Sequence, residues 1–225
     1  MYYNEPKIKD LYESLKNNRS EIKTYEDVVN QYAGWNRTLL VGDIDADLGG
    51  AIESFIRFYN EYDEQENIPV EERKPIKIYI DSNGGDLCAT FTIIDAIRLS
   101  KTPVWTIVIG SAYSGAFFIC IAGHKRIAYP LATFMYHEGS TGMGADAGKF
   151  RNFADFYDKQ LETLKQITLK YTNITEEQYK EHKKDDWWID TKEAKELGVI
   201  DEIAEAFVWN LKILGQETGE VHFMD

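Results

Sequence analysis

The clearest candidate for chemistry in this sequence is a serine between a predicted strand and an apolar helix. Ser114 follows the apolar run 104–109 and a short turn, and the small and apolar residues 115–122 come after it. This position would expose the hydroxyl at a sheet end and place the Gly115 amide among the unpaired N–H groups of a helix start. Such an amide can stabilise an oxyanion. The residues therefore allow a nucleophilic serine, and an ordinary helix N-cap is the alternative.

A pair of glycines offers a second candidate donor. Gly84 and Gly85 lie between the predicted strand 76–80 and a helix, so the chain can adopt positive φ there and bring amides close to a ligand. A tight strand-to-helix turn without a ligand is the alternative. The G-x-G-x-x-G spacing of dinucleotide sites is absent, and the residues around Ser114 do not form the G-x-S-x-G elbow of α/β-hydrolases.

A histidine offers a candidate base. His137 closes the predicted strand 133–136, where its side chain would leave the sheet and face a cleft. A histidine with an unperturbed pKa of about 6.5 can accept the serine proton and return it to a leaving amine. A structural histidine at a strand end is the alternative. His124, which precedes two basic residues, is interpreted as a solvated loop residue.

Alternating strands and helices must position these residues. Apolar and β-branched runs predict strands at 38–42, 76–80, 104–109, 126–129, 133–136 and 199–203. Apolar residues at helical spacing predict helices that start at 43–47, at 87 and at 115, a long helix over 148–170, and two shorter helices capped at Thr175 and Asp190. Loops are predicted at 61–74 and, rich in glycine, at 139–148. This alternation indicates βαβ crossovers and an α/β fold with a mainly parallel sheet.

Composition limits the classes of function. The 225 residues carry a formal net charge of -13 and have a pI near 4.8, which argues against binding a nucleic-acid backbone. The two cysteines and four histidines lack the spacing of a disulfide framework or a metal site. No secretory signal or membrane-spanning run is visible. We therefore expect a cytoplasmic protein that binds neither nucleic acid nor membrane.

The change in character along the chain predicts one sizeable domain with appended ends. Residues 1–36 are polar and charged and are predicted to form an arm. Residues 37–203 are predicted to form the folded domain, and residues 204–225 a tail.

Four segments together resemble the Clp protease proteolytic subunit family. They are IYIDSNGGDLCATFTIIDAI, TIVIGSAYSGAFFICIAG, RIAYPLATFMYHEG and DDWWIDTKEAKELGVID. Their order and spacing agree with that family over about residues 37–203, although the stretch before His137 is short by two residues. The resemblance implies the βαβ superhelix that this family shares with the crotonases. It also implies a serine endopeptidase that needs no cofactor.

The resemblance implies a role for each residue of the site. Ser114 would be the nucleophile, His137 the base, and Asp186 the carboxylate that orients the imidazole, with Asp185 as the alternative if the loop shifts by one residue. The oxyanion hole would be formed by the amides of Gly85 and Gly115. The substrate would lie as an extended strand between two segments, Asp86-Leu87 and Glu138-Gly139.

The resemblance also implies partners. Substrates would be peptides or unfolded proteins, the helix 148–170 would interlock homo-oligomeric rings into a chamber, and an ATP-driven unfoldase is a possible partner. Two departures from the family stand out. Glu138-Gly139 replaces the usual Gln-Pro after the histidine, and a longer charged arm replaces the short axial loop, which puts unfoldase docking in doubt.

Two other functions stay open at this point. The altered residues after His137 and the unusual arm are compatible with a catalytically inactive ring subunit or scaffold. A crotonase-type acyl-CoA enzyme would share the fold and a glycine-based oxyanion hole, but the sequence offers no obvious acidic pair for hydration. A Ser-Lys peptidase is disfavoured because no well-placed lysine replaces His137.

Overall fold

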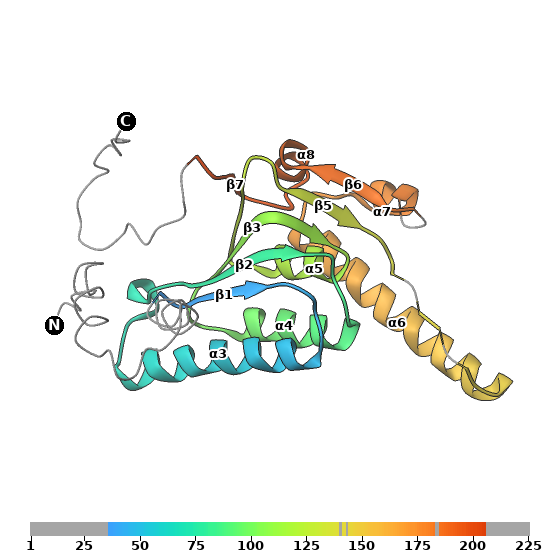
Figure 1. The fold of residues 1–225 in the computed structure, drawn as a ribbon, viewed down its shortest axis with the longest axis horizontal. Coiled ribbons are helices and arrows are strands. Elements are labelled where there is room, and N and C mark those ends of the chain that lie inside the picture. Colours follow the sequence, from blue (N-terminus) through green and yellow to red (C-terminus); the bar gives the residue numbers. More distant parts are fainter. Residues whose placement is uncertain (1–35, 140, 143, 183–184, 206–225) are drawn as a thin grey trace, which may run out of the picture.

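The computed structural model describes residues 36–139, 141–142, 144–182 and 185–205 (Figure 1). The strands are β1 (Thr38–Val41), β2 (Ile76–Ser82), β3 (Val104–Tyr113), β4 (Lys125–Ala128), β5 (Thr133–Tyr136), β6 (Trp187–Asp190) and β7 (Glu202–Ile203). The helices are α3 (Ala46–Gln65), η1 (Val70–Glu72), α4 (Leu87–Leu99), α5 (Gly115–Ala122), α6 (Ala147–Tyr171), α7 (Glu176–His182) and α8 (Thr191–Glu196). Apart from residues 36 and 204–205, the predicted arm and tail lie outside these ranges.

The strands form one mixed sheet that is mostly parallel. Its order is β1-β2-β3-β4-β7, with β5 added beside β3 and β6 beside β5. Within the described residues every strand pairing is parallel except that of β5 with β6. This arrangement confirms the predicted α/β fold class with a mainly parallel sheet.

Strand β3 has different neighbours along its length. Residues 105–108 pair with β4, and residues 111–113 pair with β5. The register between β2 and β3 shifts between Ile80 and Ser82, where this change takes place. The end of β3 is therefore directed toward β5 instead of β4.

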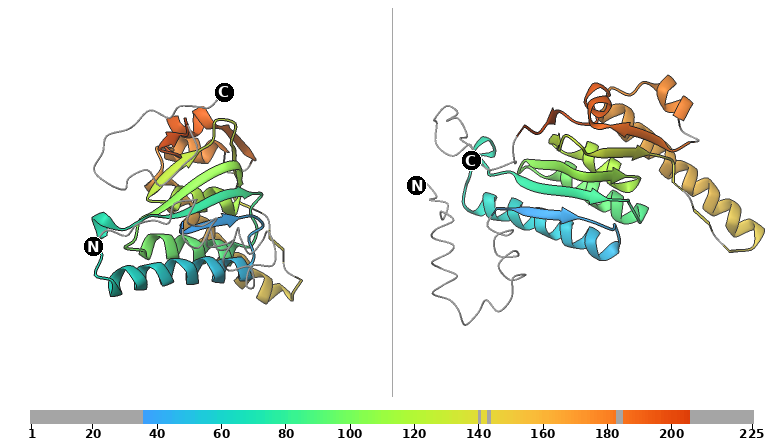
Figure 2. Two further views of the ribbon diagram at one scale, coloured as in Figure 1. Left: turned by 60° about the vertical axis from the view of Figure 1, so that its left-hand side comes forward. Right: turned by 45° about the horizontal axis from the view of Figure 1, so that its top comes forward.

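Helices cover the sheet and bury its apolar side chains. Helices α3 and α4 lie side by side along one face (Figures 1 and 2). Every residue of α5 is buried, as expected for a helix that is apolar all round. The core gathers isoleucines and valines from β2 and β3 with apolar residues of α4 and α5. This packing holds the start of α5 against the sheet. Ser114 is the residue immediately before that start.

Helix α6 confirms the predicted long helix and projects from the body (Figure 1). Its N-terminus is capped by Asp146, whose Oδ1 accepts from the amides of Gly148 and Lys149 at 3.1 and 3.0 Å. The residues of α6 that are buried, Leu164 and Thr168, both lie in its C-terminal half. Helix α7 starts with the predicted capping box, in which Thr175 and Gln178 exchange hydrogen bonds of 2.9 and 3.2 Å.

Three predicted boundaries were wrong, those of α3, β7 and β3. Helix α3 continues to Gln65, into the predicted loop 61–74, because buried Asp63 pairs with Arg37 and fixes that last turn to the fold. The predicted strand 199–203 is reduced to β7. The amides of Val199 and Ile200 donate to the carbonyl of Ala194 and so continue the end of α8 instead of a strand ladder.

Strand β6 was not predicted, and β3 runs through the predicted turn at residues 111–113. Among the described helices, none has the length and apolar character needed to cross a membrane. In the same part of the chain, no three His, Cys, Asp or Glu side chains gather as metal ligands.

Candidate active site

Three neighbouring strands bring the candidate residues to one edge of the sheet. Ser114 follows the last residue of β3, His137 follows the last residue of β5, and Asp186 precedes the first residue of β6. Strands β3 and β5 are parallel, whereas β5 and β6 are antiparallel, so these three positions lie at the same edge. The Ser114 amide also donates to the carbonyl of Met135 at 2.9 Å. The sheet ladder itself therefore sets the spacing of the site.

Ser114 uses its side chain toward the histidine. Its Oγ lies 2.7 Å from Nε2 of His137, and it makes no capping hydrogen bond to α5. Its backbone has φ 53° and ψ -123°, a conformation that non-glycine residues seldom adopt. Ser114 therefore occupies the N-cap position of α5 without capping it through its side chain, and the hydroxyl lies within proton-transfer distance of an imidazole.

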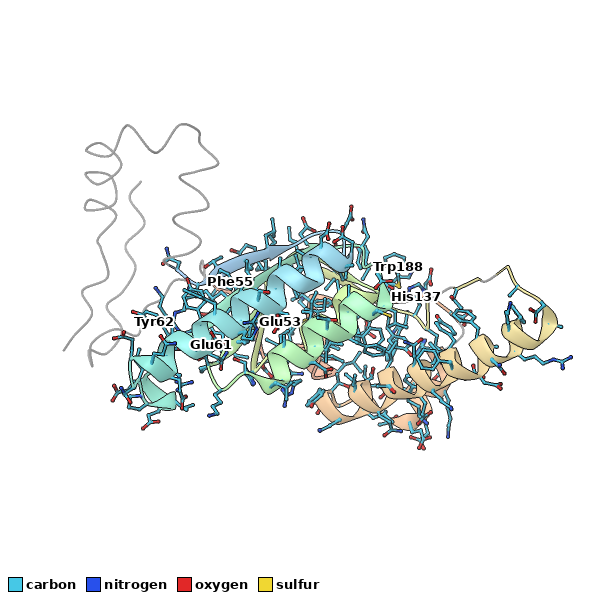
Figure 3. All side chains as sticks on the ribbon, turned by 90° about the horizontal axis from the view of Figure 1, so that it is seen from below. Glu53, Phe55, Glu61, Tyr62, His137 and Trp188 are labelled. Carbon is cyan, nitrogen blue, oxygen red and sulfur yellow. The ribbon has the colours of Figure 1, made fainter. Side chains whose placement is uncertain are left out.

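The second imidazole nitrogen faces the predicted carboxylate. Nδ1 of His137 lies 3.5 Å from Oδ1 of Asp186, which is longer than an ordinary hydrogen bond. The Asp186 side chain is 55% exposed, whereas that of His137 is 28% exposed. The neighbouring Asp185 is exposed, and its amide donates to the carbonyl of His182. Figure 3 shows His137 beyond one end of α4, on the side from which α6 extends.

The double glycine has no room for side chains, and Gly84 lies against Ser114. A Cβ atom on Gly85 would lie 2.1 Å from the carbonyl oxygen of Ile44, and Gly85 has φ 152°. Ile44 is bridged to this turn, donating to the Gly84 carbonyl at 3.0 Å and accepting from the Asp86 amide at 2.7 Å. These bonds leave the Gly85 amide without a partner among the described residues. The predicted second donor thus lies beside the serine.

A cleft of about 310 Å³ lies in front of Ser114. Its lining includes every predicted site residue except Asp186, namely Gly85, Asp86, Leu87, Ser114, Gly115, His137, Glu138 and Gly139. Five further lining residues were not predicted: Thr90, Phe118, Thr141, Tyr157 and Leu164. Phe118 could have been predicted, because it lies one helical turn after Ser114.

Two tyrosines hold the segment after His137. The Tyr157 hydroxyl donates to the carbonyl oxygen of Glu138 at 3.1 Å, and the Tyr179 hydroxyl donates to Oε1 of Glu138 at 3.2 Å. Burial, and also the nearby charge of Glu138, raises the pKa of Tyr179 to about 12 and raises the pKa of Tyr157. Both phenols therefore stay protonated near neutral pH and act as donors.

Comparison with known proteins decides the family. The family model described as Clp protease matches residues 67–207. This chain belongs to the Clp protease family. The matched range contains the double glycine, Ser114, His137 and Asp186. The resemblance predicted from the four sequence segments is therefore confirmed at the level of the family.

Relatives within the Clp protease family cover most of the chain. It is 28% identical to the ATP-dependent Clp protease proteolytic subunit 2 of Treponema denticola, over 84% of this chain and 92% of that protein. It is 32% identical to the ATP-dependent Clp protease proteolytic subunit of Lactococcus lactis subsp. lactis, over 74% of this chain and 82% of that protein. It is 35% identical to the ATP-dependent Clp protease proteolytic subunit 3 of Streptomyces avermitilis, over 58% of this chain and 60% of that protein.

Proposed function

We propose that this chain is a serine endopeptidase that hydrolyses peptide bonds of unfolded proteins or short peptides. The observation that carries this proposal is the 2.7 Å contact between Ser114 Oγ and His137 Nε2, in a serine whose hydroxyl does not cap its helix. Membership of the Clp protease family supports the same reaction. Ser114 is the nucleophile and His137 the general base.

The reaction proceeds by acyl transfer. Ser114 Oγ attacks the peptide carbonyl carbon while its proton passes to Nε2 of His137. The resulting oxyanion accepts hydrogen bonds from the amides of Gly85 and Gly115, and one such donor contributes about 3 kcal/mol in related enzymes. Collapse breaks the C–N bond, and His137 gives its proton to the leaving amine. Water then repeats the sequence and releases the acyl group from Ser114.

The third member of the proposed triad is Asp186. Its carboxylate faces Nδ1 of His137, where it favours the tautomer with a proton on Nδ1 and stabilises the imidazolium. The separation of 3.5 Å requires a small movement to form a full hydrogen bond. Such tightening is common when substrate binds.

Substrate binding uses main-chain pairing on both sides of the cleft. An extended peptide lies between Asp86-Leu87 and Glu138-Gly139, two segments that line the same cleft as Ser114 and His137. Because backbone groups make these contacts, many sequences can bind. Side chains of the substrate then enter the cleft itself.

The proposed assembly is a homo-oligomeric ring that encloses a chamber. The projecting half of α6 supports this proposal, because Phe150 and Phe156 on it are 49% and 57% exposed, and apolar residues of this size usually pack against a partner. The relatives are named as parts of ATP-dependent proteases, so an ATP-driven unfoldase is part of the proposal. A cytoplasmic location stays a prediction.

A fluorophosphonate probe tests the proposed chemistry. Such a probe forms a P–O bond with an activated serine and loses fluoride, and we expect it to label Ser114 in the native protein. Ser114→Ala should remove the label, and His137→Ala should slow it about 10³-fold or more. A fluorogenic peptide should be cleaved by the native chain and not by Ser114→Ala. Absence of both labelling and cleavage would refute the peptidase.

One observation favours a second candidate, a ring subunit without activity. Asp186 is more than half exposed and is not within hydrogen-bond distance of His137. A carboxylate in that position would orient the imidazole poorly if it never moved closer. This candidate predicts ring assembly in native mass spectrometry with no labelling of Ser114.

A further inference from the structure

Among the described residues, the carboxylate-bearing residues of the cleft lining have no lysine or arginine as a counterpart. They are Asp86 and Glu138. The two carboxylates differ in what they contact. Oδ1 of Asp86 caps α4 by accepting from the amide of Ala89 at 2.8 Å. Asp86 is also exposed, so water screens its charge.

Glu138 is held more firmly. It is half-buried, and its Oε1 accepts from the hydroxyl of Tyr179, a side chain that is only 3% exposed. Its carbonyl is held by Tyr157 from α6. The backbone and the side chain of Glu138 are thus positioned by phenols from two different helices. A carboxylate fixed in this way needs little ordering when it meets a ligand.

The charge of Glu138 is not neutralised by the protein. No lysine or arginine among the described residues pairs with it, and its second carboxylate oxygen makes no hydrogen bond to them. Lys165 lies 6.0 Å from the Tyr179 ring centre, but its amine pairs with Glu176 at 3.0 Å. A half-buried carboxylate without a cation is unfavourable, so a cationic ligand group would be stabilised there.

The floor of the same cleft is apolar. Phe118 and Leu164 are 2% and 3% exposed, and Leu87 lies at the rim. Arginine and lysine combine an aliphatic stem with a charged head, and they bury the stem on apolar surface while the head reaches a polar partner. An apolar floor beside a fixed carboxylate matches that combination.

We infer that Glu138 makes this cleft selective for a substrate with arginine or lysine as the residue whose carbonyl Ser114 attacks. The assignment to that residue follows from the lining, because the cleft shares its wall with Ser114, Gly115 and His137. The inference rests on the proposed peptidase function and adds the class of side chain that the enzyme prefers.

The test compares peptides that differ in charge and not in shape. Two fluorogenic peptide amides carry either arginine or its neutral isostere citrulline before the fluorophore, and kcat/KM is measured for both. We expect the native protein to cleave the arginine peptide about tenfold faster or more, since a charged hydrogen bond is lost in the other peptide. In Glu138→Gln the ratio should fall to near one, because the amide oxygen keeps the Tyr179 bond but lacks the charge.

A matched control removes a negative charge elsewhere. Glu177→Gln changes an exposed residue of α7, and we expect it to retain the native ratio of arginine to citrulline cleavage. The inference is overturned if the native protein cleaves both peptides equally, or if Glu138→Gln keeps the preference. A different result would show that the chain is not a peptidase at all: neither labelling of Ser114 nor cleavage of any peptide. That result would overturn both proposals.

Discussion

A Cβ atom on Gly84 would lie 2.7 Å from the Cβ of Ser114 and 2.9 Å from the carbonyl oxygen of Tyr113. Gly84 also has φ 101°, which is unfavourable for a residue with a side chain. Gly84→Ala should therefore displace the serine from His137. We expect the rate of fluorophosphonate labelling to fall about 10²-fold, the effect of a displacement near 1 Å, while the circular dichroism spectrum is kept.

The control for this substitution is another glycine. A Cβ on Gly50 of α3 would meet nothing within 4 Å. Gly50→Ala should leave the labelling rate unchanged and raise the free energy of unfolding by about 0.5–1 kcal/mol, because alanine favours a helix interior. Equal labelling rates in both variants would contradict the argument from Gly84.

Replacing the proposed orienting carboxylate should have a moderate effect on catalysis. Asp186 is 55% exposed and 3.5 Å from His137, so Asp186→Asn should lower kcat/KM about 10²-fold, less than the roughly 10⁴-fold loss in a buried triad. Peptide cleavage at fixed pH measures this change. Asp185→Asn is the comparison and should have little effect. A larger loss in Asp185→Asn would transfer the role to Asp185.

A buried ion pair stabilises the opposite end of the sheet. Arg37 donates two hydrogen bonds of 2.7 and 2.6 Å to Asp63, and the hydroxyl of Thr102 donates to Asp63 at 2.8 Å. Asp63→Ala leaves a buried guanidinium without its carboxylate. We expect the free energy of unfolding to fall by about 3–5 kcal/mol in urea denaturation.

An exposed ion pair on the same helix provides the control for Asp63. Glu53 pairs with Arg57 at 3.0 Å on the outer surface of α3 (Figure 3). Because water screens this pair, Glu53→Ala should change the midpoint of denaturation very little. A similar loss of stability in both variants would show that burial is not the cause.

A second ion pair should make stability depend on acid pH. Burial would raise the pKa of Asp201, but its hydrogen bonds to Arg126 and the guanidinium charge outweigh burial and lower that pKa below its ordinary value of 3.8. The pair therefore stabilises the native state above the unfolded pKa, and this contribution is lost as pH falls through the folded pKa.

Asp201→Asn tests this pH dependence. Asp201→Asn should be less stable than the native protein at neutral pH, and the difference should shrink as the pH falls below 3.8, the ordinary pKa of this carboxyl. Urea denaturation at a series of pH values measures both stabilities. A difference that stays constant across that range would contradict the proposed role of Asp201.

Most of the fold could be predicted because its signals are local. The apolar run of α5, the helical spacing of apolar residues in α6 and the capping box of α7 each depend on residues within a few turns of one another. The exception is β6. It has only four residues with alternating burial and follows a charged segment, so its pairing with β5 depends on contacts distant in the sequence.

The same distinction applies to the site. Ser114 and His137 could be predicted from strand ends, but nothing local brings Asp186 to His137, because β6 carries it there. Only the family resemblance pointed to that residue, and its role remains a prediction. Thr90 and Leu164 of the cleft lining were missed because they come from α4 and α6, and their convergence with Ser114 depends on how those helices pack.

The location of Ser114, His137 and Asp186 at the ends of β3, β5 and β6 has a consequence for how such a protein can vary. Replacing an outward-facing strand residue leaves the spacing of the ends intact, whereas inserting or deleting one residue reverses every following side chain and moves the end by about 3.3 Å. Length changes should therefore be tolerated in the connections and not within these strands. The chain can change much of its surface chemistry while the count of residues along each strand stays constant.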